Sequence, residues 1–303
     1  MLPMRGPNDA MGEVVPRVAV CVLLMVCGWQ GRAVAQCTPP PGSSEARLLA
    51  FYDVPLAFSP AGAPERLPAW GVVAAVEAAP IRAPSPALER TGYCFVSKTE
   101  HTRLAPAFGR PRVTLGLPAG VALEASYLPP VPIGSAEPNL ASVAISRTQR
   151  VAAISGAGRM ELLLRAQGTF GHVTGAITCP ASGLQSSDPQ RPCYGTRPSR
   201  DTFRPGMTGV EGALGFASGG GRVAVYGGGG VTWLRPRFQV GFTDVTGAVD
   251  RTEVAVDLRR TVAFGGVTVR AARTVDLSAQ IYSVSADATT FRVVAGYRIG
   301  NRE

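Results

Sequence analysis

Charged and amide side chains recur at every second position within otherwise apolar segments of this chain. Glu161, Arg165 and Gln167, for example, alternate with Leu162 and Leu164. Alternate side chains of a β-strand lie on one face of a sheet, so such segments place charges of both signs on one surface. A surface of this kind can bind or conduct a small polar solute, or its charges can pair with one another and fill an enclosed space. The residues that we expect on this surface are Glu77, Glu124, Glu161, Arg165, Gln167, Glu211, Asp257, Arg259, Asp276, Gln280, Tyr282, Arg292 and Arg298.

Histidine would most directly indicate general acid–base chemistry, and this chain has two histidines. His101 follows Glu100, and His172 ends an alternating segment. Either could form a general-base pair with an acid such as Asp188 or Asp201. No nucleophile-elbow or metalloprotease motif accompanies them. We therefore predict no catalytic residue, no metal site and no cofactor.

The N-terminus has the features of a secretory signal peptide. A basic residue precedes an apolar run at 18–29, and an Ala-Val-Ala cleavage site ends at Ala35. The run is too short to span a bilayer, which needs about 20 residues. We therefore expect residues 1–35 to be removed after export. Residues 36–68 then form an N-terminal periplasmic segment, in which the sequence SSEARLLAFYDV is a possible short helix.

Four cysteines follow the expected cleavage site, and an even number of cysteines in an exported chain indicates disulfides. Cys179 and Cys193 lie in one Pro-, Ser- and Gly-rich loop, so we predict that they pair. Cys37 and Cys94 then pair by elimination. Because we expect the N-terminus at the periplasmic end, this second bridge requires one of two arrangements. Either one of the two segments passes through the interior of the folded protein, or loop 80–110 folds down into that interior and plugs it.

From residue 69 onward the dominant pattern is an alternation of apolar and polar residues, which is typical of β-strands. Many of the alternating segments are ten residues or longer, as tilted membrane-spanning strands need to be. The strands that we predict are 69–79, 111–117, 120–128, 139–150, 158–172, 204–217, 221–234, 251–271, 274–284 and 287–299.

The connections between these segments alternate in length. Tight turns at 118–120 and 218–221 contrast with long loops at 80–110, 128–138 and 173–203. Short turns at one end and long loops at the other are typical of membrane barrels. We therefore predict an all-β fold for residues 69–303. It is an up-and-down antiparallel transmembrane β-barrel of about ten strands, with eight or twelve as alternatives, short periplasmic turns and long extracellular loops.

Glycine and proline mark irregular places in the predicted strands. The four glycines at 227–230 lack the lysine and the following helix of a phosphate loop, so we expect them to permit a bend instead. The apolar phase runs through Leu258 and Phe264 and changes after Gly265-Gly266, which predicts a bulge there. The segment 235–247 could extend a strand beyond the membrane, although Pro236 favours a break.

The cleavage-site sequence AVAQ, the alternating strands and the loop asymmetry make residues 69–299 resemble the small outer-membrane β-barrel proteins of diderm bacteria. The stretches LAPAFGRPRVTLGLPAGVALEASYLPP (104–130) and RFQVGFT (237–243) are similar to those of uncharacterised barrel proteins. The resemblance implies a location in the outer membrane, contact with its lipids, and the barrel-assembly machinery as a partner during biogenesis. It implies no particular activity.

Three classes of function are compatible with this sequence. The first is a narrow channel or a barrel that binds or transports a small polar solute. The second is a structural or surface-recognition barrel with a filled lumen. The third comprises an enzyme with its site at the barrel rim and a soluble periplasmic β-barrel binder. The net charge is +9 without a run of five basic residues, whereas a nucleic-acid site would gather its basic residues on one face. We therefore expect no nucleic-acid partner.

Overall fold

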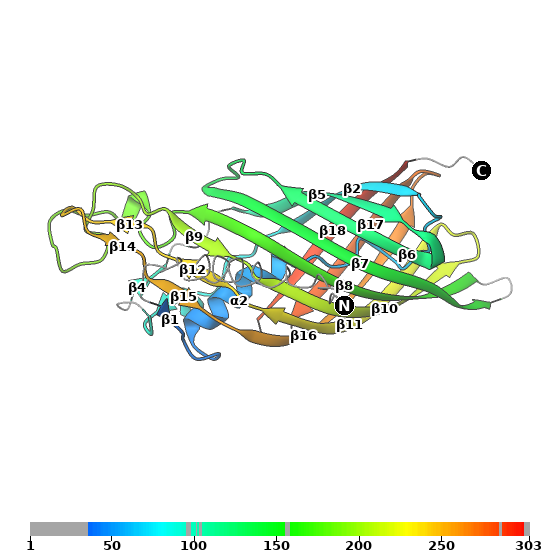
Figure 1. Ribbon diagram of the computed structural model, residues 1–303, viewed down its shortest axis with the longest axis horizontal. Helices are drawn as coiled ribbons and strands as arrows, with labels where there is room; N and C mark the ends of the chain where they lie inside the picture. Colours follow the sequence, from blue (N-terminus) through cyan, green and yellow to red (C-terminus); the bar gives the residue numbers. More distant parts are fainter. Residues whose placement is uncertain are drawn as a thin grey trace, which may run out of the picture. The chain divides into compact units, whose positions relative to one another are not determined.

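The computed structural model describes residues 36–94, 98–100, 102, 105–154, 158–284 and 287–299. Within these residues, ten strands form the wall of a barrel (Figure 1). In chain order they are β2 (Val72–Pro80), β5 (Ala107–Gly116), β6 (Val121–Leu128), β7 (Ala136–Ile154), β8 (Gly158–Gly175), β10 (Met207–Ser218), β11 (Val223–Leu234), β16 (Leu258–Arg270), β17 (Val275–Val284) and β18 (Ala288–Ile299).

The barrel closes because β7 pairs with both β6 and β8. The order around the wall is β7–β8–β10–β11–β16–β17–β18–β2–β5–β6, and β6 returns to β7. Every neighbouring pair in the wall is antiparallel. The predicted all-β, up-and-down barrel is confirmed, with ten strands rather than eight or twelve.

The outer face of the wall is apolar. Each of the ten strands exposes at least one large apolar side chain, and Val76, Leu164 and Ile281 are about 60% exposed. Such a belt around a closed barrel is the surface that a membrane barrel turns toward lipid. One exposed member from each strand, in chain order, is Val76, Val113, Leu123, Val143, Leu164, Val210, Val225, Val269, Leu277 and Phe291.

The two ends of the barrel differ in their connections. We call the end that carries residues 81–106, 129–135, 176–200 and 235–257 the long-loop end, and the opposite end the short-turn end. The connection between β17 and β18 is short but lies at the long-loop end, so the predicted asymmetry holds for all connections except this one.

The wall continues past the long-loop end as a small sheet, which we call the outer extension. It consists of β9 (Asp201–Arg204), β12 (Arg237–Gln239), β15 (Glu253–Ala255) and β1 (Gln36–Cys37), in that order outward from β8. Pro236 separates β11 from β12. The strand therefore breaks at Pro236, as predicted, and β12 then continues the wall beyond the barrel. The remaining elements here are α3 (Pro86–Glu89), β3 (Arg90–Thr91), β4 (Lys98–Thr99), β13 (Phe242–Thr243), β14 (Val249–Asp250) and the 3-10 turn η2 (Ala181–Gly183); the 3-10 turn η1 (Pro118–Gly120) lies at the short-turn end.

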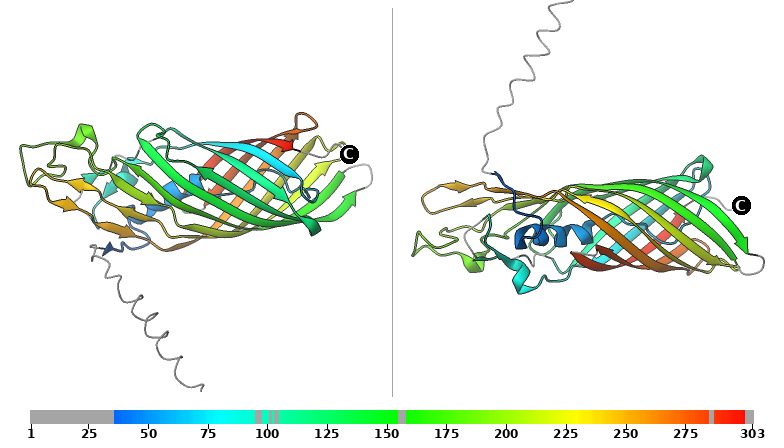
Figure 2. Two further views of the ribbon diagram at one scale, coloured as in Figure 1. Left: turned by 45° about the horizontal axis from the view of Figure 1, so that its top comes forward. Right: turned by 90° about the horizontal axis from the view of Figure 1, so that it is seen from below.

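The predicted helix near the N-terminus is α2 (Ser44–Leu56). The Ser43 side chain caps it by accepting a hydrogen bond from the Ala46 backbone N–H at 3.2 Å. Its apolar side chains, including Leu49, Ala50 and Val54, are buried. Figure 2 shows α2 at the long-loop end, with the chain beyond it entering the barrel. No helix among the described residues is long and apolar enough to cross a membrane.

Residues 57–66 pass through the barrel interior from the long-loop end to the short-turn end. Ala57 and Phe58 are buried, whereas Trp70, which follows at the short-turn end, is 69% exposed. This position differs from the expected periplasmic one, in which residues 36–68 lie outside the barrel. An alternating pattern reports strands but carries no information about a non-repeating segment that other strands surround.

The predicted bulge at Gly265-Gly266 is wrong. The register of β16 with β11 and β17 continues unbroken through both glycines. Leu258 and Phe264 face the interior, where they join the apolar core around α2. The change of phase therefore reflects an inner face that is apolar near the long-loop end and polar near the short-turn end.

The glycines at 227–230 lie within β11, as part of the wall. A Cβ atom added to Gly228 would lie 2.2 Å from the carbonyl oxygen of Gly212 on the neighbouring strand β10. The bare backbone therefore permits a close approach of the two strands, which accounts for this glycine without a bound phosphate.

Candidate functional site

Four buried arginines of the wall hold the chain that threads the lumen. Arg110 and Arg112 on β5, Arg165 on β8 and Arg292 on β18 are each at most 3% exposed. Residues 57–66 form no helix or strand, so their backbone groups need partners in the interior. Guanidinium groups supply several N–H donors in a fixed plane and can satisfy several carbonyl oxygens at once.

The arginines donate to consecutive carbonyl oxygens at the junction of α2 and the threading chain. Arg110 donates to Leu56 at 3.1 Å and to Ala57 at 2.8 Å. Arg112 donates to Ser59 at 2.8 Å, and Arg165 donates to Phe58. Arg292 donates to Val54 at 2.8 Å and to Ala57 at 2.6 Å. Three strands of the barrel, β5, β8 and β18, thus bind six residues of the N-terminal segment, 54–59, through its backbone.

Three buried glutamates balance these charges. Glu77 accepts from Arg110 at 3.0 Å and from Arg112 at 2.5 Å. Glu124 bridges Arg112 at 2.7 Å and Arg165 at 3.1 Å. Glu211 accepts from Arg165 at 3.2 Å and from the Tyr282 hydroxyl at 3.3 Å. Buried charges are tolerated when they are paired in this way, and removal of one member leaves the others uncompensated.

The ring of Phe58 lies at the centre of this cluster. The guanidinium carbons of Arg112, Arg110 and Arg165 lie 4.2, 4.8 and 5.0 Å from its centroid. Cations at this distance from an aromatic ring are attracted to its face. The threading chain is therefore held by a side chain as well as by its backbone, and we call residues 54–66 the plug.

A second cluster holds the other end of the plug. Glu65 accepts from Arg270 at 2.9 Å and pairs with Arg298, and Arg159 lies 3.7 Å away. The Arg66 backbone N–H donates to Glu161 at 3.1 Å. The Ser59 hydroxyl of the first cluster donates to Gln280 at 2.6 Å, and between the two clusters the Ala63 backbone N–H donates to the Thr268 hydroxyl at 2.9 Å. Polar side chains of the wall therefore contact the plug at both ends and in between.

The structure places most of the predicted inner residues around the plug. Arg165 and Arg292 bind it directly, as do Glu161 and Gln280. The Gln167 amide is buried without a hydrogen-bond partner among the described residues. Asp276 and Arg298 lie at the short-turn end and pair at 2.6 Å. The predicted residues that are buried in the lumen are Glu77, Glu124, Glu161, Arg165, Gln167, Glu211, Gln280, Tyr282 and Arg292.

Two predicted inner residues lie elsewhere. Asp257 and Arg259 are exposed on the outside, because Leu258 between them faces the apolar core. The sequence analysis predicted that the apolar side chains point to lipid along the whole strand, and it therefore placed Asp257 and Arg259 on the inner face, which is wrong. At the long-loop end the interior holds α2 rather than polar side chains, so apolar residues face inward.

Several residues that bind or balance the plug were not predicted, among them Arg110, Arg112, Arg270 and Glu65. Arg110 and Arg112 alternate within FGRPRV, but Pro111 between them and a strand start placed at 111 concealed the pattern. Glu65 lies in the irregular plug, where no period exists to show its direction. The alternation of Phe108, Arg110 and Arg112 is the signal that would have identified the first two.

Both predicted disulfides are present. Cys179–Cys193 closes the loop 176–200, and Cys37–Cys94 joins the start of the described chain to loop 81–106. Of the two arrangements expected for the second bridge, the N-terminal segment threads the barrel. The described residues of loop 81–106 pack around α2 instead of entering the lumen, so this loop is not the plug. For example, the Tyr52 hydroxyl donates to the Thr102 carbonyl oxygen at 3.1 Å.

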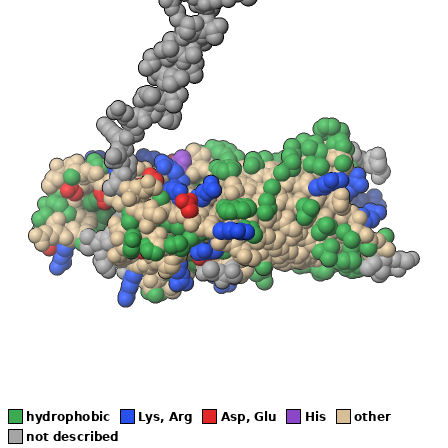
Figure 3. Space-filling view, turned by 60° about the horizontal axis from the view of Figure 1, so that its bottom comes forward, with side chains coloured by type: hydrophobic (Ala, Val, Ile, Leu, Met, Phe, Trp, Pro, Cys, Tyr) green, Lys and Arg blue, Asp and Glu red, His purple; other side chains and the backbone are tan. Residues whose placement is uncertain are grey.

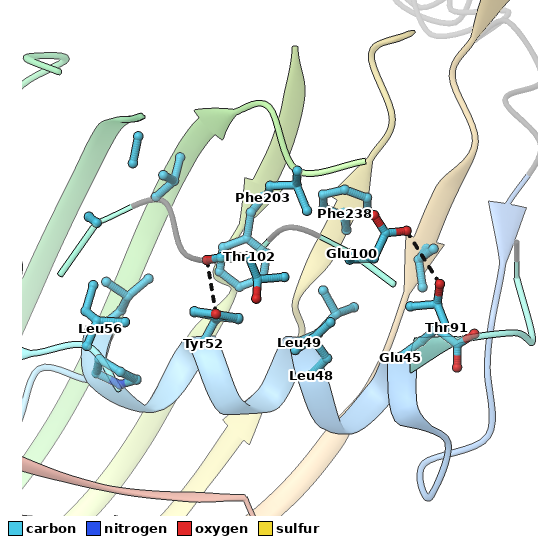
Figure 4. A pocket seen from close by; sticks show the side chains of 17 residues that line it. Glu45, Leu48, Leu49, Tyr52, Leu56, Thr91, Glu100, Thr102, Phe203 and Phe238 are labelled. Atoms are coloured by element: carbon cyan, nitrogen blue, oxygen red, sulfur yellow. Dashed lines mark hydrogen bonds between the residues drawn. The ribbon is translucent and has the colours of Figure 1, made fainter. Parts of the chain in front are cut away.

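An apolar cavity of about 130 Å³ lies beside α2 at the long-loop end (Figure 4). Leu48, Leu49 and Tyr52 of the helix face Phe203 and Phe238 of the outer extension across it. The few polar groups at its edge include Glu45 and Glu100. A cavity with this lining fits a small apolar group better than a polar solute.

Glu45 fastens the start of α2 to loop 81–106. Its carboxylate accepts from the backbone N–H groups of Gly92 at 2.7 Å and Tyr93 at 2.5 Å. Burial by itself raises the pKa of Glu45, but these N–H donors outweigh it and the pKa is lowered. The contact lies next to Cys94, so the hydrogen bonds and the disulfide hold the same part of the loop.

Asp53 in α2 is fully buried, and neither of its carboxylate oxygens has a partner among the described residues. Burial, reinforced by the nearby Asp287, raises its pKa well above the usual value. The folded protein therefore holds a proton that the unfolded chain releases above about pH 4. As pH rises from there toward the raised pKa, the free energy of unfolding falls by at most about 1.4 kcal/mol per pH unit.

We expect Asp53→Asn to remove this loss. The variant and the wild type should differ little at pH 3, and the variant should be more stable at pH 8. Urea titrations at a series of pH values measure the difference. Asp250→Asn, at an exposed position, is the matched control and should leave the pH dependence unchanged. Equal pH slopes for the wild type and Asp53→Asn would contradict the prediction.

Among the described residues, no catalytic arrangement joins His172, Asp188 and Asp201. Asp201 is fully buried and accepts from the backbone N–H groups of Ile177, Thr178 and Gly241, which makes it an organiser of the loops. Asp188 pairs with Arg191 at 3.3 Å. His172 contacts neither acid among the described residues, and His101 lies outside them. No cluster of potential metal ligands occurs within the described part of the chain.

Comparisons with known proteins identify no family for this chain. No protein-family model matches it, and no curated protein matches it. Several solved structures align with it, and two of them do so at 9% identity over 76% of this chain and 97% of theirs. These two are Ail, the attachment invasion locus protein of Yersinia pestis, at a TM-score of 0.29, and the same protein with the heparin analogue sucrose octasulfate, at 0.26. These scores are too low to establish a common fold, and the barrel is established by its own strand pairing.

Proposed function

We propose that this protein is an outer-membrane barrel with a closed lumen that presents its long-loop end as a binding surface outside the cell. In this proposal the chain is exported, cleaved after Ala35 and inserted by the barrel-assembly machinery. The apolar belt on all ten strands supports the membrane location, because a soluble protein rarely exposes so large a continuous apolar surface. Long loops face outward in barrels of this type.

The observation that carries the closed lumen is the binding of the plug by four buried arginines. The diameter of a barrel grows with the number of its strands, and side chains alone fill the interior of an eight-stranded barrel. A ten-stranded barrel is only slightly wider, so its interior is narrow. Residues 54–66 occupy that space, and hydrogen bonds from arginines on three strands hold them there. A conducted polar solute would have to displace them. We therefore favour surface recognition over a channel, and propose no catalytic activity.

The long-loop end is built to keep a defined surface. Two disulfides fix its loops, and Asp201 joins loop 176–200 to the segment after β12. Helix α2 and the apolar cavity lie directly beneath. An ordered surface loses less conformational entropy on binding than a mobile one.

In planar lipid bilayers we expect the full-length protein to produce no current steps, because the plug closes the lumen. A variant that lacks residues 36–66 should produce small steps with a preference for anions. The two clusters left in the lumen of this variant carry seven arginines against five acidic residues. The arginines are Arg110, Arg112, Arg159, Arg165, Arg270, Arg292 and Arg298, and the acids are Glu77, Glu124, Glu161, Glu211 and Asp276. Bilayer recordings of both proteins at equal concentration measure the difference.

Heat-dependent mobility on gels provides the control. Both proteins should co-fractionate with the outer membrane and migrate differently before and after boiling, as closed barrels do. Current steps from the intact protein as large as those of the deletion variant would refute the closed lumen. A periplasmic product without a mobility shift would refute the membrane location itself.

A further inference from the structure

Arginine side chains gather on the outside of the barrel, at the boundary between the apolar belt and the outer extension. They line an open groove of about 450 Å³ together with Trp233, and the lining cations are Arg235, Arg237 and Arg259. The space-filling view shows basic side chains gathered on this face between the hydrophobic wall and the loop-bearing end (Figure 3). The groove lies on the outer surface and so is separate from the lumen.

The position of the groove matches one edge of the lipid layer. On β16, the exposed Val269 at the short-turn end and Arg259 are ten residues apart. At about 3.3 Å per residue and a strand tilt of about 40°, they are separated by about 25 Å along the barrel axis, which is the height of the apolar band of such barrels. On β11, Val223 and Trp233 stand in register with these two residues and span the same height. Trp233 therefore lies at headgroup level, where tryptophan is enriched.

The charges of the groove are not balanced by the protein. Arg237 is fixed by hydrogen bonds to the Val256 carbonyl oxygen at 2.6 Å and to Asp257 at 3.1 Å. Arg235 and Arg259 are exposed, and neither has a salt bridge among the described residues. Three arginines and one aspartate leave the groove with two excess positive charges, beside a surface that faces hydrocarbon.

We propose that this groove binds the phosphate group of an anionic lipid headgroup in the outer leaflet. Arginine presents paired N–H donors that match the oxygens of a phosphate, and each basic residue near a lipid surface strengthens binding of anionic lipid. Arg237, held by its two acceptors, is oriented before the lipid arrives, whereas Arg235 and Arg259 are free to close on the phosphate. The inference rests on the proposed membrane location.

Trp233 allows the site to be tested directly. The chain has three tryptophans, and Trp29 lies in the segment that we propose is removed on export. Trp70→Phe therefore leaves Trp233 as the reporter in the mature protein. In vesicles of phosphatidylcholine, quenching by brominated phosphatidylcholine measures lipid contact. Brominated phosphatidic acid at the same mole fraction should quench Trp233 as though it were enriched about tenfold at the groove.

Two double variants separate this site from general attraction to a negative membrane. Arg235→Gln with Arg259→Gln should abolish the enrichment. Arg222→Gln with Arg273→Gln should preserve the enrichment of phosphatidic acid. These two substitutions remove the same charge, but the exposed arginines that they replace lie at the short-turn end of β11 and β16. Equal quenching by the two brominated lipids, or equal losses in both double variants, would overturn the proposal.

The remaining outcomes are equally distinct. If inorganic phosphate alone shifts the Trp233 emission in detergent micelles and displaces phosphatidic acid, the groove is a general anion site and the lipid assignment fails. If brominated phosphatidylcholine does not quench Trp233 at all, the protein is not embedded, and the proposed function fails rather than this inference alone.

Discussion

Replacement of Arg112 by methionine is expected to lower the free energy of unfolding by about 3–5 kcal/mol, the range for breaking a buried ion pair. Arg112 joins Glu77 to Glu124, donates to the Ser59 carbonyl oxygen and lies over the Phe58 ring. Its loss leaves both buried carboxylates with less positive charge to balance them. Urea titration in detergent micelles, followed by circular dichroism and by the heat-dependent gel shift, measures the change.

Arg147→Met is the matched control for this prediction. Arg147 is exposed at the short-turn end of β7, so the same change of side chain there should alter the free energy of unfolding by less than about 0.5 kcal/mol. Arg112→Lys should fall between the two, because it keeps the charge but not the several donors of a guanidinium. An Arg112→Met variant as stable as Arg147→Met would show that the network does not stabilise the plugged barrel.

Removal of the Cys37–Cys94 disulfide is expected to have the second large effect. The bridge has a sequence separation of 57 residues, and closing a loop of this length restricts the unfolded chain by about 4 kcal/mol. Both α2 and the whole plug lie inside this loop. The variant Cys37→Ser with Cys94→Ser should therefore lower the free energy of unfolding and expose α2 to proteases at the long-loop end.

The other disulfide provides an internal comparison. Cys179–Cys193 has a separation of 14 residues and should contribute about 3 kcal/mol, but it encloses only a loop. Its removal should leave α2 as protease-resistant as in the wild type. Limited proteolysis with mass mapping of the fragments distinguishes the two variants. Equal resistance of α2 in both would mean that the arginines alone hold the N-terminal segment in place.

The sequence by itself predicted the barrel because strand alternation is a local property. In β8, the buried Glu161 and Arg165 and the exposed Leu164 follow directly from the period of two. The alternation of short and long connections then predicted which end of the barrel carries the turns and which carries the loops. The disulfides could also be predicted from the sequence, because four cysteines in an exported chain can pair in only a few ways.

What fills the lumen was decided only by the tertiary structure. Arg292 contacts Val54 across 238 positions of sequence, and Gln280 contacts Ser59 across 221. No local period connects such residues. The sequence around a buried arginine also does not reveal whether the arginine donates to a carboxylate, to a solute or to the backbone of another segment. The plug has no repeating pattern of its own, so its place could not be read from its residues.

The assignment of faces failed for the same physical reason. The rule that apolar side chains point to lipid presumes a polar interior, and it holds where the plug is bound by charges. It fails at the long-loop end, where α2 makes the interior apolar and turns Leu258 inward and Arg259 outward. The sequence determined that two faces alternate along each strand. Which face is inner depends on what the barrel encloses, and that follows only from the folded chain.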